Sequence, residues 1–157
     1  MKLGFLEGSA GDSALVLGTG PISIGVIMCL KAHGVRTVVL SEKSTTRSQQ
    51  ARDVGSDHVF NPVTDDVEKE SKRLTDGFGP HVAFECAGVQ PSFDAAMHSV
   101  RGRGTIVNVG VFEKDVTFNP NIINRRSLRY DRGRICTLAF RVANSARQIR
   151  RKQRLYS

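Results

Sequence analysis

The sequence lacks any apolar run near the roughly 20 residues that a helix needs to span a bilayer, which argues against a membrane protein. Its first residues, MKLGFLEGSAGD, hold one lysine and a very short apolar stretch, unlike a secretory signal peptide. The three cysteines lie far apart, form neither a CxxC pair nor a zinc-binding spacing, and suit a reducing compartment: Cys29, Cys86 and Cys136. We therefore expect a cytoplasmic protein without a disulfide framework.

Acidic residues are almost missing from the C-terminal segment, residues 131–157. This segment holds eight basic residues against Asp131 alone, whereas residues 1–130 hold 15 basic and 14 acidic residues. The net charge of +8 is therefore a property of the tail and not of the body of the chain. We expect the tail to be poorly ordered or loosely docked, because so many like charges are costly to bury.

Short apolar runs alternate with helical patterns along the body of the chain. The runs that predict strands are 14–17, 37–40, 58–60, 82–86 and 105–109, with weaker candidates at 116–118 and 127–130. The predicted helices span 22–33, 44–54, 65–74 and 91–100. This order predicts an α/β fold with a doubly wound (Rossmann) parallel sheet of about six strands over residues 12–130, preceded by a lead-in at 1–11 and followed by the tail.

Local signals mark where several of these helices begin. Ser44 is placed to cap the helix that follows it. Asp65, with Glu68 three residues later, resembles a capping box at the start of the next helix. Pro91 suits the first turn of the helix at 91–100.

A glycine-rich turn follows the first predicted strand. Residues 18–23 read GTGPIS, which is a GxGxxG pattern with Ser23 in place of the third glycine. Gly18 allows a tight turn, and Gly20 leaves the backbone open to a pyrophosphate. The helix that opens immediately afterwards would direct its free N–H groups and its dipole at the phosphates. The turn therefore predicts a dinucleotide site, in which Ser23 must fit where the helix meets the sheet.

An acidic residue follows at the distance that this kind of site requires. Glu42 ends the second predicted strand, 22 residues after Gly20. A carboxylate there accepts hydrogen bonds from the adenosine ribose hydroxyls and repels a 2′-phosphate. The pattern favours NAD over NADP, although the nearby cations Lys43 and Arg47 leave room for NADP.

Four segments, GDSALVLGTGP, VVLSEKSTTR, FECAGV and GTIVNVGVF, together resemble a known family. They are similar to the cofactor half of the zinc-dependent medium-chain alcohol and polyol dehydrogenases, above all the butanediol and sorbitol dehydrogenases, over residues 10–130. The resemblance implies an NAD-dependent oxidoreductase. It also implies that the cofactor-binding residues are Gly18, Gly20, Pro21 and Ile22 at the phosphates, Glu42 and Arg47 at the adenosine, and Cys86, Ala87, Gly88, Val109, Gly110 and Val111 toward the nicotinamide.

The zinc site of that family has no counterpart in this sequence. The family builds it in a separate domain ahead of the glycine turn, whereas only about ten residues, without Cys or His, precede Gly11 here. The four histidines are scattered and do not have the spacing of metal ligands: His33, His58, His81 and His98. We therefore assign no catalytic or metal-binding residue and expect this chain alone not to oxidise alcohols or polyols.

Three functions stay open on these grounds: an oxidoreductase cofactor domain separated from its catalytic partner, a non-enzymatic NAD(H)-binding module, and a truncated fragment that no longer binds cofactor. The expected partner is a dinucleotide. The resemblance also implies pairing of two chains through the sheet edge near residues 119–130. No membrane contact is expected, and nucleic-acid binding by the arginine-rich tail is disfavoured because few aromatic residues accompany its charges.

Overall fold

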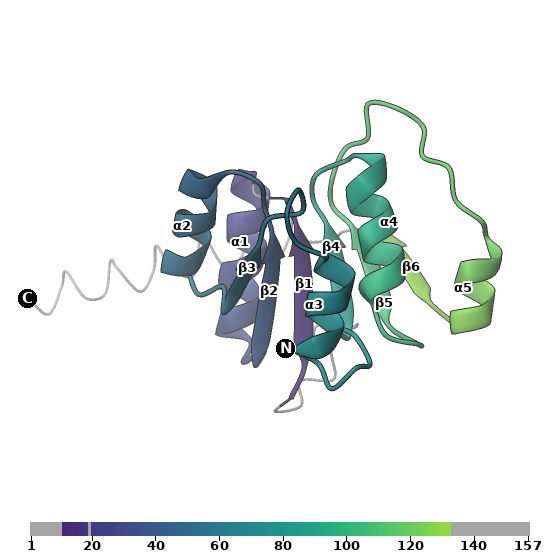
Figure 1. Ribbon diagram of the computed structural model, residues 1–157, viewed down its shortest axis with the longest axis horizontal. Coiled ribbons are helices and arrows are strands. Elements are labelled where there is room, and N and C mark those ends of the chain that lie inside the picture. The colour runs from purple at the N-terminus through teal and green to yellow at the C-terminus, as the bar shows by residue number, and fades with distance from the viewer. Residues whose placement is uncertain (1–10, 19, 133–157) are drawn as a thin grey trace, which may run out of the picture.

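A computed structural model describes residues 11–18 and 20–132 of the chain. Its centre is a parallel sheet of six strands in the order β3-β2-β1-β4-β5-β6 (Figure 1). The strands are β1 (Ser13–Leu17), β2 (Thr37–Ser41), β3 (His58–Phe60), β4 (Val82–Glu85), β5 (Thr105–Asn108) and β6 (Arg129–Arg132). The predicted doubly wound parallel sheet is confirmed. The strands β1 to β3 extend to one side of the sheet, and β4 to β6 then extend to the other side of β1. Folds of this kind bind ligands at the point where the strand order switches, here between β1 and β4.

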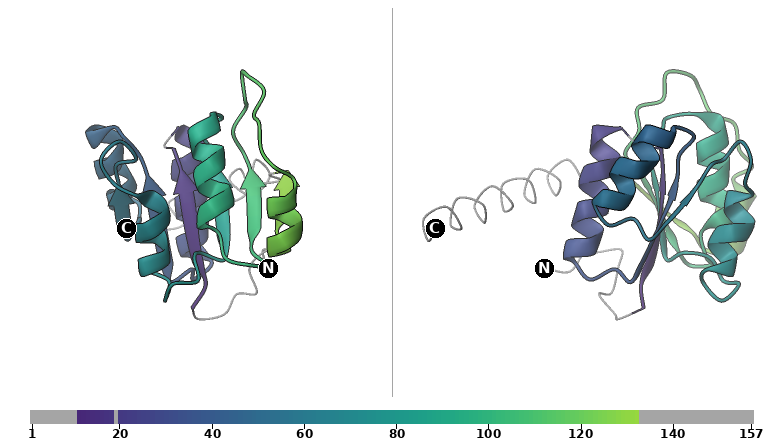
Figure 2. Two further views of the ribbon diagram at one scale, coloured as in Figure 1. Left: turned by 45° about the vertical axis from the view of Figure 1, so that its right-hand side comes forward. Right: turned by 60° about the vertical axis from the view of Figure 1, so that its left-hand side comes forward.

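The central strands are apolar along their whole length because helices cover both faces of the sheet. Helices α1 (Pro21–Ala32) and α2 (Thr45–Asp53) lie on one face, and α3 (Val67–Arg73) and α4 (Gln90–Ser99) lie on the other (Figure 2). Successive residues of a strand point to opposite faces, so Val16 joins the core under α1 whereas Leu15 joins the core under α4. The sheet is thereby fixed between two apolar layers.

The helix starts agree with the sequence at two of three places. Ser44 caps α2, where its Oγ accepts a hydrogen bond from the Arg47 N–H at 3.5 Å. A proline stands in the first turn of α4, as predicted. The predicted cap at Asp65 is wrong by one residue, because Asp66 caps α3 by accepting from the Lys69 N–H at 3.0 Å. The Asp65 carboxylate instead accepts from the Asn61 N–H at 2.8 Å in the preceding turn.

The segment between β5 and β6 differs most from the prediction. Residues 116–118 form no strand, because Phe118 packs its ring on Phe93, with the centroids 5.4 Å apart, instead of pairing with the sheet. A short helix that the sequence pattern did not predict, α5 (Asn121–Arg126), precedes the last strand. Ser127 ends this helix with a left-handed backbone, φ 51°, so β6 begins at Arg129 and continues to Arg132, two residues into the segment assigned to the tail.

The remainder of the predicted tail, residues 133–157, lies outside the described residues, as do residues 1–10 of the predicted lead-in at 1–11 and Thr19. Over the described ranges, no helix combines the length and the apolar character that crossing a membrane requires.

Candidate functional site

The turn after β1 requires glycine at its first position for two reasons. Gly18 has φ +88°, a conformation that L side chains rarely adopt. A Cβ atom added there would stand 2.9 Å from the Cβ of Ala87, closer than such atoms approach. The Gly18 N–H donates to the Ser41 carbonyl at 2.9 Å, which fixes the turn to the end of β2. Gly18 therefore joins the loops that follow β1, β2 and β4.

The second glycine of the turn borders open space. Gly20 is the N-cap of α1 with an ordinary φ of −78°, no side chain caps the helix, and a Cβ atom added at Gly20 would meet no atom within 4 Å. Pro21 follows as the first helical residue, and the Ile22 side chain is 47% exposed beside it. The positive end of the helix dipole is thus accessible to an anion.

Ser23 fits where the fingerprint has its third glycine. Its side chain is fully buried between α1 and the sheet, next to Cys86 at the end of β4. Burial raises the pKa of the Cys86 thiol to about 12, although the Ser23 hydroxyl lowers it in part. The close packing of helix on sheet is therefore kept with a serine in place of glycine.

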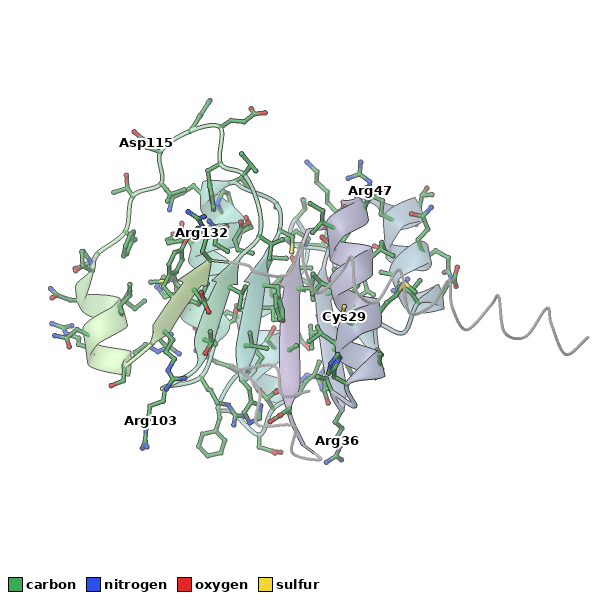
Figure 3. The ribbon with its side chains drawn as sticks, turned by 180° about the vertical axis from the view of Figure 1, so that it is seen from behind. Cys29, Arg36, Arg47, Arg103, Asp115 and Arg132 are labelled. Atoms are coloured by element: carbon green, nitrogen blue, oxygen red, sulfur yellow. The ribbon has the colours of Figure 1, made fainter. Side chains whose placement is uncertain are left out.

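The predicted ribose acid lies directly after β2. Glu42 is 6% exposed, its N–H donates to the Phe60 carbonyl at 2.9 Å, and its Oε1 accepts from the Ser44 N–H at 2.7 Å. The carboxylate is therefore held in place at the carboxyl end of the strand. Arg47 is exposed on the first turn of α2, at the same end of the molecule as Arg132 (Figure 3).

The structure adds one residue that the sequence reasoning missed. Glu85, the last residue of β4, is fully buried, and its carboxylate accepts from the Ala87 N–H at 3.0 Å, the Gly88 N–H at 2.9 Å and the Ser92 hydroxyl at 2.5 Å. A buried carboxylate with three donors fixes the shape of the loop after β4. The signal was present in the sequence as a charged residue inside the apolar run VAFEC.

The loops after β4 and β5 are packed against each other through two glycines. Gly88 has φ +69°, and a Cβ atom there would collide with the Val111 carbonyl. A Cβ atom at Gly110 would stand 2.7 Å from both Glu85 Oε2 and the Gly88 nitrogen. The Val109 and Gly110 N–H groups each donate to the Glu85 carbonyl at 2.8 Å. The Val111 side chain is 87% exposed at the rim of this contact.

All twelve predicted residues therefore lie at the carboxyl edge of the sheet, either in the loops after β1, β2, β4 and β5 or in the first turns of α1 and α2. The Gly18, Ala87 and Gly110 segments are in close contact, and Glu42 is joined to them through the bond from Gly18 to Ser41. The arrangement offers a helix N-terminus, a fixed carboxylate and exposed apolar side chains along one edge. Burial also raises the pKa of the Cys29 thiol, on α1, to about 11, so the thiols of Cys29 and Cys86 are both protonated at neutral pH.

No group of three or more Cys, His, Asp or Glu residues suited to a metal ion occurs in the part of the chain that the structure describes. His81, for example, is engaged otherwise, since its Nδ1 lies 3.1 Å from the Ser13 nitrogen and its Nε2 lies 2.6 Å from Arg101. The zinc that the resemblance implies therefore does not fit these residues.

Comparison with known proteins agrees with the resemblance to the zinc-dependent dehydrogenases. The model of the zinc-binding dehydrogenase family matches residues 21–144, which extends beyond residue 130, where the resemblance was expected to end. The (R,R)-butanediol dehydrogenase of Neisseria gonorrhoeae is 36% identical over 120 residues, 76% of this chain and 34% of that protein. The L-threonine 3-dehydrogenase of Pyrococcus horikoshii is 35% identical over 112 residues, 71% of this chain and 32% of that protein. The chain thus spans about a third of the length of these relatives.

Solved structures agree with this fold. The crystal structure of 2R,3R-butanediol dehydrogenase from Bacillus subtilis has a TM-score of 0.76 at 33% identity, over 87% of this chain and 40% of that one. A structure described as a zinc-binding dehydrogenase of Sinorhizobium meliloti bound to NADP has a TM-score of 0.74 at 27% identity, over 81% of this chain and 38% of that one. From its sequence and its fold, this chain belongs to the zinc-binding dehydrogenase family.

Proposed function

We propose that this chain is the NAD(H)-binding domain of a medium-chain alcohol or polyol dehydrogenase. The observation that carries the proposal is the meeting of three glycine-dependent loops at the carboxyl edge of the sheet, beside the uncapped start of α1. Gly18 and Gly88 keep side chains out of this edge, and Gly20 opens the helix N-terminus. A pyrophosphate is the ligand whose charge and size suit such an opening.

Each part of the edge has a role in this proposal. The α1 N-terminus binds the pyrophosphate, and the Glu42 carboxylate accepts hydrogen bonds from the adenosine ribose hydroxyls. Arg47 flanks the adenine. The loops at 86–88 and 109–111 border the nicotinamide ring, where the exposed Val111 side chain offers an apolar surface. The cofactor supplies a hydride acceptor when it is bound, and the residues of this chain bind and orient it.

We also propose that this site prefers NAD(H) to NADP(H). The Glu42 carboxylate is fixed by the Ser44 N–H and is almost fully buried. A 2′-phosphate on the ribose would therefore meet a negative charge that cannot turn away, whereas the ribose hydroxyls would meet an acceptor.

Oxidation of an alcohol also requires groups that hold the substrate and take its proton. The described residues offer no set of zinc ligands, so we infer that these groups are supplied from outside residues 11–132. The substrates named for the relatives, butanediol and threonine, indicate a small molecule with a secondary alcohol. A non-enzymatic NAD(H)-binding module is the second candidate, and the same lack of ligands favours it.

Calorimetric titration of the purified 157-residue chain with NADH and NADPH tests the proposal. We expect saturable binding of NADH and weaker binding of NADPH. Absence of binding by both would overturn the proposed function, and equal affinities would overturn the role of Glu42. Formation of NADH from 2,3-butanediol by the chain alone, abolished by a chelator, would overturn the inference that the catalytic groups lie elsewhere.

A further inference from the structure

A recess lies at the amino ends of the strands, at the opposite end of the sheet from the loops described above. It has a volume of about 560 Å³ and is lined by the turns that precede β4 and β5 and by the C-terminal end of α5. Four arginines and one aromatic residue form most of its wall: Arg101, Arg103, Arg125, Arg126 and Phe78. In Figure 3, Arg103 projects from this amino edge, whereas Arg47 and Arg132 lie at the cofactor edge. We call this recess the arginine pocket.

Two of its arginines are held by neutral partners. The Arg126 guanidinium donates to the carbonyls of Met97 at 2.6 Å and of Val100, at the C-terminal end of α4. Arg101 donates from Nε to the Gly79 carbonyl at 2.9 Å. None of these three bonds cancels a full positive charge, so both guanidinium groups stay cationic while they are fixed in position.

The other two arginines have no partner for their side chains in the described part of the chain. Arg103 and Arg125 are exposed, and no hydrogen bond or ion pair involves their guanidinium groups there. Their backbones are nevertheless fixed, because the Arg103 N–H donates to the Arg126 carbonyl at 2.8 Å and joins the turn before β5 to the end of α5. Two arginines whose side chains have no partner among the described residues are thus held over one recess.

Two carboxylates lie near the pocket, but in the described part of the chain neither is paired directly with one of its arginines. Asp12 and Asp76 act on Arg101 through space, and within the described ranges none of the four arginines forms an ion pair with a carboxylate. Like charges that line one recess repel one another, and the free-energy cost of this repulsion is recovered when an anion binds between them. The charge therefore points to an anionic ligand.

The shape and the aromatic wall indicate which anion. Guanidinium groups bind phosphate oxygens in a bidentate manner, and the volume falls in the range of small-molecule sites. Phe78 is 69% exposed, and an aromatic ring in that position can stack on a nucleobase. We propose that the arginine pocket binds a nucleoside di- or triphosphate, with Arg103 and Arg125 on the phosphates and Phe78 against the base. This site is separate from the proposed cofactor site.

Calorimetric titration of the full chain with ATP, with and without saturating NADH, tests the proposal. ATP should bind in both cases, because the two sites lie at opposite edges of the sheet. The double variant R103A/R125A should weaken ATP binding at least about tenfold, and R36A/R52A, which removes two exposed arginines elsewhere, should leave it unchanged. Circular dichroism confirms that both variants are folded.

A second pair of titrations separates the nucleotide from its phosphates. F78A should weaken ATP binding several-fold and leave the binding of inorganic triphosphate unchanged. Loss of ATP binding in the presence of NADH, or an equal loss in R36A/R52A, would overturn the pocket as the site. Equal affinity for ATP and inorganic triphosphate, together with no effect of F78A, would overturn the role of the base. Since NADH affinity is measured separately, failure of the proposed cofactor site remains distinguishable from failure of this one.

Discussion

Replacing the two glycines of the turn should separate the stability of the fold from the binding of the cofactor. Gly20 has an ordinary φ, and its missing side chain faces open space, so Gly20→Asp should fit without strain. Aspartate is also among the preferred N-cap residues, so the free energy of unfolding should stay within a few tenths of a kcal/mol of the unmodified value, or rise slightly.

The same substitution should nearly abolish dinucleotide binding. Its carboxylate would stand at the helix N-terminus where the pyrophosphate is expected to bind. Two unit charges about 5 Å apart repel by about 3 kcal/mol at an effective dielectric constant of about 20. That energy corresponds to a loss of about a hundredfold in NADH affinity. Gly20→Asn, a cap of similar size without the charge, is the matched control and should lose less affinity.

A substitution at Gly18 should instead lower the stability of the fold. Gly18→Ala forces an alanine into φ +88° and brings its Cβ atom to 2.9 Å from Ala87. The left-handed backbone costs about 1–2 kcal/mol and the overpacking about as much again, so the unfolding free energy should fall by about 2–4 kcal/mol. Urea unfolding measures the free energy of unfolding of each variant, and calorimetric titration measures its affinity for NADH. The reasoning is refuted if Gly20→Asp binds NADH as tightly as the unmodified chain, or if it unfolds more easily than Gly18→Ala.

Four further predictions concern other parts of the molecule. Glu42→Gln keeps an acceptor for the Ser44 N–H but removes the charge, so the preference for NADH over NADPH in titrations should fall about tenfold, about 1.4 kcal/mol; an unchanged preference would count against the assignment. Glu85→Gln places an amide donor against N–H donors in a buried site, so urea unfolding should report a loss of about 2 kcal/mol, and a neutral effect would contradict the role of this carboxylate. Burial, followed by the nearby Arg101 charge, lowers the pKa of His81 below 6.5, so the unfolded chain binds the extra proton and unfolding free energy should decrease as the pH falls below about 6.5; a His81→Asn variant with the same pH dependence would refute this. The exposed strand β6 should pair two chains in sedimentation experiments at high concentration, and a monomer throughout would remove this expectation.

Local patterns in the sequence determined the order of the elements and the chemistry of the edge. Alternating apolar runs and helical patterns fixed a parallel sheet, because only a strand covered on both faces is apolar throughout. The glycine turn and Glu42 were recognisable because a tight turn, a helix start and an acid are each local features of the chain. The sequence could not predict that Ser23 fits against Cys86, since that depends on how α1 packs on β4.

Tertiary structure decided the features that depend on contacts between distant segments. Phe118 packs on Phe93, so residues 116–118 form no strand although their own residues favour one. Gly88 and Gly110 are required by the approach of two loops more than 20 residues apart, and Glu85 becomes their common anchor only once β4 and β5 are adjacent. The arginine pocket likewise brings together residues from three separate segments of the chain, before β4, before β5 and at the end of α5. Burial, close approach and the sum of neighbouring charges are properties of the packed chain, and no pattern along a single segment contains them.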